Sequence, residues 1–222
     1  MNSVIKQMFT VLILVGSLSG MVLAGSYSLT KPFIEQHKLE ELKESIFVVL
    51  PDAKSYEDIS ANGIKLYKGL SESNEPAGYA FVAEGTGFQG VIRMIVGIAP
   101  DLETVLGMQV LEQVETPGLG AKITEDSFEQ QFSGLQPAWE DALIVASQAQ
   151  KDAEAGTEEA PAEQTTFEFL SYVKIVEPDD PNEIQAITGA TISSAAVIRI
   201  INQHLDDVWE MVQEQHEKEG AQ

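Results

Sequence analysis

Cysteine is absent from this chain of 222 residues. Its absence excludes disulfide bonds, thiolate metal sites, cysteine-ligated iron–sulfur clusters and a lipid-modified N-terminal cysteine. Positive charge is also scarce, because 13 Lys and Arg residues stand against 35 Asp and Glu residues, for a formal net charge of −22. Such a surface repels nucleic acid and anionic lipid headgroups. Any redox role is therefore left to a bound organic cofactor.

Motifs for independent catalysis are missing as well. The three histidines, His37, His204 and His216, are scattered and form no metal-ligand spacing, and we expect His204 to be a surface residue. No carboxylate pair stands out from the acidic composition, and no serine lies in a nucleophile elbow. Residues 85–90 fit the Gly-x-Gly-x-x-Gly pattern, but a strand-like run follows them instead of a helix. This segment therefore favours a hairpin loop over a dinucleotide site.

Charged residues are missing between Lys6 and Lys31. Residues 8–29 are long enough for a membrane-spanning helix, which needs about 20 apolar residues. A cleaved signal peptide, with a small-residue site around Ala24, is the alternative. We favour a retained anchor because the apolar character continues to Phe33. Lys6 and the terminal amine predict a cytoplasmic tail, which places the remaining chain on the periplasmic or extracellular side of a bacterial or archaeal inner membrane.

The rest of the chain is long enough for one medium-sized domain. Residues 32–50 predict a stalk helix that begins at Pro32 and stops before Pro51, and its apolar side is Leu42, Ile46, Val49 and Leu50. The segment 147–166 is acidic and lacks large apolar residues, so it predicts a flexible insertion. The predicted divisions are residues 1–30 for tail and anchor, 31–51 for the stalk, 52–215 for the domain and 216–222 for a polar tail.

Short runs rich in branched and aromatic residues predict β-strands. They cover Ile64–Tyr67, Tyr79–Ala83, Val91–Ile98, Val105–Val114 and Tyr172–Val176. Residues 127–132 predict a short helix, and residues 194–215 predict a C-terminal helix with one apolar face. That face consists of Val197, Ile201, Leu205, Val208 and Val212. These elements predict an α+β fold with a mainly antiparallel sheet.

Residues 188–194 read Thr-Gly-Ala-Thr-Ile-Ser-Ser and precede this last helix. Ser193 or Ser194 is the expected N-cap, and Gly189 permits a tight turn before it. Since a helix start offers unpaired N–H groups and a positive dipole end, Thr191 lies where a phosphate would be stabilised. The local pattern alone favours an ordinary Ser/Thr-capped helix.

The four residues 188–191 also resemble the flavinylation motif of the FMN-binding domain family. In that family the second threonine of the motif carries FMN through a phosphoester bond. Residues 115–123, which read Glu-Thr-Pro-Gly-Leu-Gly-Ala-Lys-Ile, resemble a second family motif. Residues 78–85 and 91–98 follow the family's order, and the resemblance extends from the anchor to about residue 205, with a gap near the acidic insertion.

The resemblance implies a single extracytoplasmic FMN-binding domain, with FMN bound covalently to Thr191. It also implies that a flavin transferase, using FAD as donor, closes over small neighbours of Thr191, and that nearby hydroxyls assist the phosphate. The further cofactor-binding residues would be Thr188, Gly189, Ala190, Ser193, Ser194, Thr116, Gly118, Leu119 and Gly120. Glu115 would be a polar contact or a residue that stabilises the fold. By local reasoning alone, residues 115–120 are equally typical of a plain turn.

Within the family the resemblance is strongest to the G subunits of Rnf-type ion-translocating complexes, and more distant to the C subunits of sodium-translocating NADH:quinone oxidoreductases. It implies an electron-transfer subunit whose partners are the other membrane subunits of such a complex. The alternatives are a stand-alone membrane-tethered module serving a terminal reductase and a flavin-free scaffold domain. The sequence departs from the family pattern at one position that bears on recognition by the transferase. Gln185 stands where relatives usually place Asp, and Glu183 lies nearby.

Overall fold

A computed structural model describes residues 3–139, 169–174 and 176–220. The predicted insertion at 147–166 therefore lies outside the described residues. The chain divides into two units, Met1–Lys43 and Glu44–Gln222.

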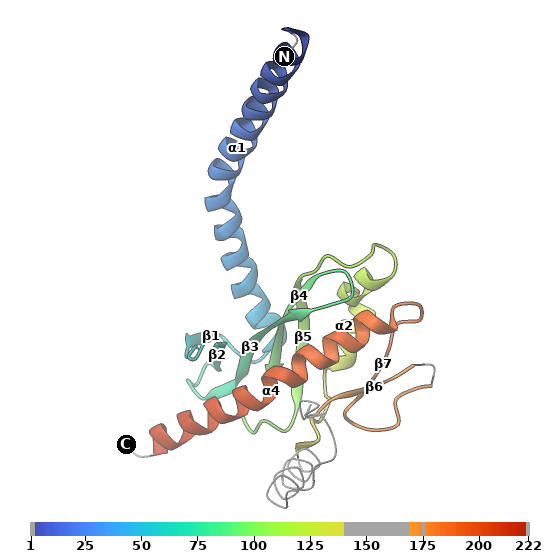
Figure 1. Ribbon diagram of the computed structural model, residues 1–222. Coiled ribbons are helices and arrows are strands. Elements are labelled where there is room, and N and C mark those ends of the chain that lie inside the picture. The colour runs from blue at the N-terminus through green and yellow to red at the C-terminus, as the bar shows by residue number, and fades with distance from the viewer. Residues whose placement is uncertain (1–2, 140–168, 175, 221–222) are drawn as a thin grey trace, which may run out of the picture. The chain divides into compact units, whose positions relative to one another are not determined.

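The N-terminal helix α1 runs without interruption over Ser3–Val49 (Figure 1). Residues 32–49 are helical and the helix ends before Pro51, as predicted, but the predicted start at Pro32 is wrong, because Pro32 lies inside α1. Proline has a fixed φ close to the helical value, so it fits the helical backbone at the cost of one backbone hydrogen bond. Among the described helices, α1 has the length and apolar composition needed to cross a membrane. Its large apolar side chains from Val4 to Phe33 are exposed.

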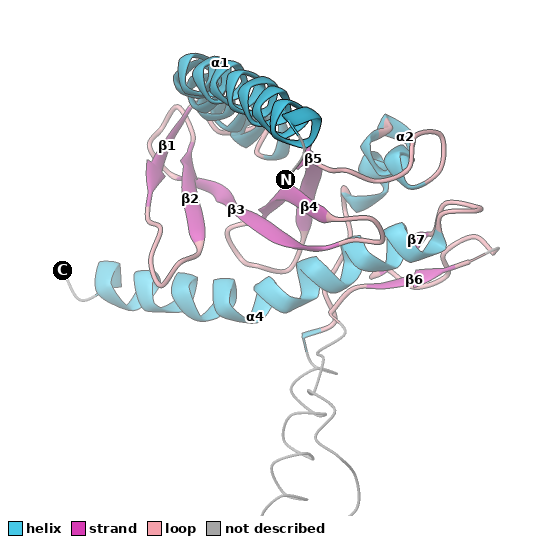
Figure 2. Ribbon diagram, turned by 45° about the horizontal axis from the view of Figure 1, so that its top comes forward, coloured by secondary structure: helices cyan, strands magenta, loops and turns pink. Residues whose placement is uncertain are grey.

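Five strands form an antiparallel meander in which sequence neighbours are also spatial neighbours (Figure 2). The strands are β1 (Ser55–Asp58), β2 (Lys65–Leu70), β3 (Pro76–Thr86), β4 (Val91–Ile98) and β5 (Val105–Glu112). The order confirms the mainly antiparallel sheet and four of the predicted strands. Local patterns do not predict strand β1, because its sequence Ser-Tyr-Glu-Asp is polar and largely exposed.

The hairpin between β3 and β4 confirms the interpretation of the glycine-rich segment 85–90. The register pairs Thr86 with Val91, and the N–H of Gly87 donates to the carbonyl of Gly90 at 2.7 Å. Neither strand is followed by a helix here, so the geometry of a dinucleotide site is absent from this described segment.

Short elements complete the second unit. Strands β6 (Ser171–Val173) and β7 (Glu183–Gln185) pair in parallel. Three helical turns follow β5, and they are η1 (Gly120–Thr124), α2 (Asp126–Glu129) and η2 (Gln130–Phe132). The last two occupy the position of the helix predicted over 127–132.

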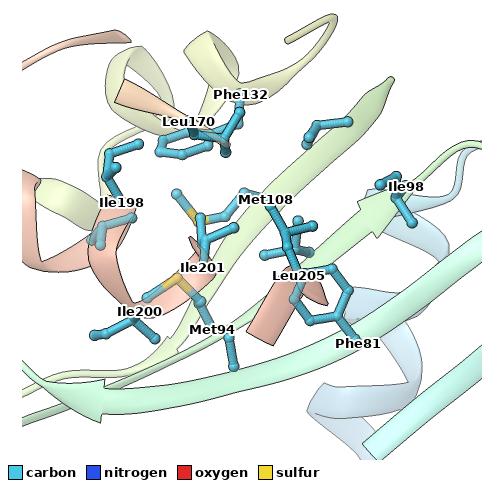
Figure 3. Packing of buried hydrophobic residues seen from close by; sticks show 14 of the residues in the cluster. Phe81, Met94, Ile98, Met108, Phe132, Leu170, Ile198, Ile200, Ile201 and Leu205 are labelled. Atoms are coloured by element: carbon cyan, nitrogen blue, oxygen red, sulfur yellow. The ribbon is translucent and has the colours of Figure 1, made fainter. Parts of the chain in front are cut away.

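The C-terminal helix α4, Thr191–Gly220, lies across one face of the large sheet (Figure 2). All five predicted apolar positions of this helix are buried. Figure 3 shows Ile201 and Leu205 of α4 near Met94 and Phe81 of the sheet, within one hydrophobic core. The sheet thus fixes the position of the helix start, where Thr191 lies.

The other face of the sheet carries the end of α1, from Glu44 onward. Ile46, Val49 and Leu50 are fully buried there, as predicted. A Cβ atom at Gly97 of β4 would overlap the carbonyl oxygen of Val49 and lie 2.9 Å from its carbonyl carbon. Glycine at this position therefore permits the close approach of helix and strand.

Candidate functional site

The segment that precedes α4 makes a tight turn. Gly189 has a φ of +82°, a conformation that other residues rarely adopt. The N–H of Ala190 donates to the carbonyl of Ile187 at 2.9 Å, and the helix begins at the next residue, Thr191. Thr188 and Gly189 are exposed, and Thr191 is half-buried.

The first turn of α4 retains free hydrogen-bond donors. The first N–H groups of a helix have no acceptor within the helix. Within the described residues, no acceptor takes the N–H groups of Thr191, Ile192 or Ser193, and the Thr191 hydroxyl makes no hydrogen bond. This helix start therefore has the donors that stabilise an anion.

The two serines do not cap the helix, which corrects the prediction. Because α4 begins at Thr191, Ser193 and Ser194 lie inside its first turn and are buried. The Ser194 hydroxyl donates to the carbonyl of Ala190 at 3.2 Å and accepts the N–H of Ile187 at 3.0 Å. It therefore stabilises the turn before the helix. The Ser193 hydroxyl donates to Oε2 of Glu115 at 2.6 Å.

Glu115 connects three segments of the chain. Its side chain is 4% exposed, and its Oε1 accepts the N–H groups of Phe88 and Gln89 at 2.8 and 2.9 Å. Its Oε2 accepts the Ser193 hydroxyl. Burial alone would raise the pKa of Glu115, but the hydrogen bonds from Ser193 and from the backbone of the β3–β4 loop together lower it. Glu115 is therefore a carboxylate held in its ionised form.

Two glycines make room for this carboxylate. A Cβ atom at Gly120 would lie 2.5 Å from Oγ of Ser193 and 2.6 Å from Oε2 of Glu115. A Cβ atom at Gly87 would lie 2.5 Å from Oε1 of Glu115. The loop that follows Glu115 is compact, since the carbonyl of Thr116 accepts the N–H groups of Leu119 and Ala121, both at 3.1 Å.

These segments enclose a pocket of about 160 Å³ at the start of α4. It brings together most of the predicted cofactor residues, namely Glu115, Thr116, Leu119, Gly120, Gly189, Ala190, Thr191 and Ser193. Thr188, Gly118 and Ser194 do not line it. Gly118 has a φ of +75° and open space around it, so it serves the turn.

Sequence reasoning missed two residues of this pocket, Phe88 and Ile192. Together with Leu119 they form an apolar rim, and their side chains are 60%, 62% and 50% exposed, respectively. Large apolar side chains are seldom exposed together without a partner or ligand. The sequence feature that could have indicated Phe88 is its position as a large apolar residue at the tip of a glycine-rich hairpin.

Other polar groups lie apart from the pocket. A larger cavity of about 760 Å³ near Trp139 and Pro181 contains none of the predicted site residues. His204 is partly buried, more so than predicted, with its Nδ1 2.8 Å from the carbonyl oxygen of Ile200. Nε2 of His216 lies 2.9 Å from the hydroxyl of Tyr79. The described residues include no cluster of acidic or histidine side chains suited to a metal ion.

The position that departs from the family pattern lies on strand β7. The N–H of Gln185 donates to Oε1 of Gln131 at 2.7 Å, and its side chain is exposed. Glu183, on the same strand, accepts the hydroxyl of Ser171 at 3.4 Å. Neither residue lines the pocket.

Comparison with known proteins gives a consistent result. Residues 87–206 match the family described as FMN-binding domain. The chain is 30% identical to the G subunit of the ion-translocating oxidoreductase complex of Methanosarcina acetivorans, over 92% of this chain and 94% of the relative. It is 28% identical to the G subunit of the proton-translocating ferredoxin:NAD(+) oxidoreductase complex of Clostridium ljungdahlii, over 86% and 84% of the two chains.

A solved structure shares the fold. The crystal structure of Shewanella oneidensis NqrC superposes with a TM-score of 0.51 at 20% identity, and the match covers 71% of this chain and 67% of that one. The pocket at the start of α4 lies within the matched family segment.

Proposed function

This chain belongs to the FMN-binding domain family, and from that membership we propose that it is a membrane-anchored electron-transfer flavoprotein subunit with FMN esterified to Thr191. The observation that carries the proposal is the position of the Thr191 hydroxyl. It lines the pocket at the helix start, is half-buried and has no hydrogen-bond partner among the described residues.

The neighbouring hydroxyls support the choice of Thr191. Ser193 and Ser194 are buried and already hydrogen-bonded, to Glu115 and to Ala190. Thr188 is exposed and lies outside the pocket lining. Thr191 alone among these four residues combines an unengaged hydroxyl with a place in the pocket.

The pocket and its apolar rim offer groups suited to the two ends of FMN. The phosphate, as the ester of Thr191, would accept hydrogen bonds from the free N–H groups of the first helical turn. Phe88, Leu119 and Ile192 would contact the isoalloxazine ring, which needs an apolar surface. When bound, FMN supplies the redox chemistry, and the protein binds and orients it.

Attachment requires a separate flavin transferase, because a threonine hydroxyl is a weak nucleophile. With FAD as donor, the Thr191 oxygen bonds to the phosphorus of the FMN half, and the pyrophosphate bond breaks. AMP leaves, and the hydroxyl proton is released. Thr188 and Gly189 are exposed beside Thr191, and the small size of Gly189 and Ala190 would let such an enzyme close over the segment.

We further propose that α1 anchors the chain in the inner membrane and that the FMN-binding domain lies on the periplasmic or extracellular side. The relatives are named as subunits of ion-translocating oxidoreductase complexes, so the expected partners are the other membrane subunits of such a complex. The domain extends from about residue 52 to residue 215.

The test is a denaturing gel of the full-length protein coexpressed with a flavin transferase. The wild type should show a fluorescent flavin band, Thr191→Ala should show none, and Thr188→Ala should retain the band. A band that persists in Thr191→Ala overturns the site. Isolation from native membranes then separates the roles, because membrane subunits that copurify support the complex and their absence supports a stand-alone module. Protein without flavin would indicate the scaffold alternative.

A further inference from the structure

We propose that Glu115 is a positioning residue, which holds the β3–β4 loop and the start of α4 in the arrangement that the flavin site requires. The inference rests on the proposed function, since it concerns the same pocket. It assigns to Glu115 a role through other residues in place of a direct contact with FMN.

The contacts of the carboxylate divide between two segments. Oε1 accepts the N–H groups of Phe88 and Gln89, which lie 27 and 26 residues earlier in the chain. Oε2 accepts the hydroxyl of Ser193, which lies 78 residues later. One side chain therefore connects the hairpin that carries the apolar rim to the helical turn that carries Thr191.

Each carboxylate oxygen accepts a hydrogen bond from these protein donors. Glu115 is 4% exposed, and its backbone N–H donates to Oε1 of Gln113 at 2.6 Å, which fixes the backbone. Gly87 and Gly120 leave the space that the carboxylate occupies, because a Cβ atom at either position would overlap it. A group so enclosed acts on the cofactor through the residues that it holds.

The position of Phe88 depends directly on this contact. The backbone N–H of Phe88 is fixed by Glu115, while its ring is exposed at the pocket. Ser193 lies two residues after Thr191, so its hydrogen bond to Glu115 fixes the rotation of the first helical turn. Loss of the carboxylate should therefore loosen both walls of the pocket together.

The first experiment uses full-length protein, in detergent and without flavin, from cells that lack the transferase. Hydrogen exchange of the amides of Phe88 and Gln89 is measured in the wild type, Glu115→Ala and Glu115→Gln. Since N–H groups that lose their charged acceptor are no longer protected by it from exchange with water, Glu115→Ala should accelerate their exchange at least about tenfold. Glu115→Gln keeps an acceptor oxygen and should stay within about threefold of the wild type. Exchange in Glu115→Ala equal to that of the wild type overturns the proposal.

The second experiment measures the rate of flavin loading with transferase and FAD. Glu115→Ala should load at least about tenfold more slowly than the wild type, with a changed visible circular dichroism signal for any flavin attached. Glu115→Gln should recover most of the rate. Ser193→Ala removes one of the contacts of Glu115 and leaves the others. Its rate of flavin loading should be intermediate, and this variant replaces Glu115→Ala in the experiment if Glu115→Ala does not fold.

Glu129→Ala is the matched control. Glu129 is also a partly buried carboxylate that accepts a backbone N–H, that of Val110, at 2.8 Å, but it does not line the pocket. The Glu129→Ala variant should load flavin at the wild-type rate. If the wild type itself does not load, the proposed function fails and the exchange experiment still decides the role of Glu115. If the wild type and all variants load equally with the same dichroism, the positioning role is wrong.

Discussion

Gly120→Ala should disrupt the pocket more severely than Gly118→Ala, although both replace a glycine of the same loop. The Cβ atom added at Gly120 would lie 2.5 Å from Oγ of Ser193 and 2.6 Å from Oε2 of Glu115, too close to both atoms of the hydrogen bond that joins these side chains. The Cβ atom added at Gly118 meets nothing within 4 Å.

The expected magnitudes follow from these surroundings. Overpacking costs about 1–3 kcal/mol, and loss of a hydrogen bond to a charged group costs about 1.5–3 kcal/mol. Because the two costs overlap at one contact, we expect Gly120→Ala to lower the free energy of unfolding by about 3 kcal/mol. Gly118→Ala adds only the strain of a φ of +75°, about 1 kcal/mol.

The assay is thermal unfolding of the full-length protein in detergent, followed by circular dichroism. For a domain of this size, 3 kcal/mol corresponds to a decrease in Tm of about 6–12 °C, and 1 kcal/mol to about 2–4 °C. Flavin loading should also fall in Gly120→Ala and remain near the wild-type level in Gly118→Ala. If the two variants unfold within about 0.5 kcal/mol of each other, the close contact of Gly120 with Glu115 and Ser193 is wrong.

Three further predictions concern the same domain. Since hydrogen bonds lower the pKa of folded Glu115 despite its burial, its stabilisation is full above the unfolded pKa, about 4.3, and is lost as the pH falls through the lower folded value. In urea unfolding, the free energy of unfolding of the wild type should exceed that of Glu115→Gln by an amount that shrinks at acid pH. A difference that does not change with pH would contradict this. Burial raises the pKa of Glu129, so its ionisation costs stability above that pKa. Glu129→Gln should therefore be more stable than the wild type at neutral pH, with a gain that disappears as the pH falls toward about 4.3. Urea unfolding at several pH values checks this gain, whose sign is opposite to the loss expected for Glu115→Gln. Gly97→Ala should lower the free energy of unfolding by at least about 2 kcal/mol because its Cβ overlaps the backbone of Val49, whereas Gly107→Ala, whose Cβ lies 3.5 Å from Cα of Val49, should change it by less than about 1 kcal/mol. Equal unfolding midpoints in the two variants would contradict the close packing.

Local patterns predict the regular elements well where packing and pattern agree. The branched residues of Val91–Ile98 predict β4 to the residue, and the apolar spacing of α4 predicts the buried face that reaches the sheet. Local patterns do not predict the polar strand β1 or the three-residue strand β7. Pairing with neighbouring strands stabilises both, and their own sequences contribute little. A local rule favours a helix start at Pro32, but α1 continues through it.

The site shows the limit of local reasoning more clearly. The motif around Thr191 and the loop after Glu115 are visible in the sequence, and most of their residues share one pocket. The contact between Ser193 and Glu115 is not visible there, because their hydrogen bond joins positions 78 residues apart. The sequence places Phe88 only in a hairpin loop, since it is the fold that brings this hairpin to the helix start.

The separation of these partners has a consequence for biosynthesis. The hairpin and Glu115 emerge from the ribosome well before Ser193 and Thr191, so a nascent chain holds one wall of the pocket without the other. Modification that needs the assembled pocket must then follow translation and folding of the whole domain. Bound flavin would therefore mark chains that are complete and folded, since truncated or misfolded chains would stay colourless.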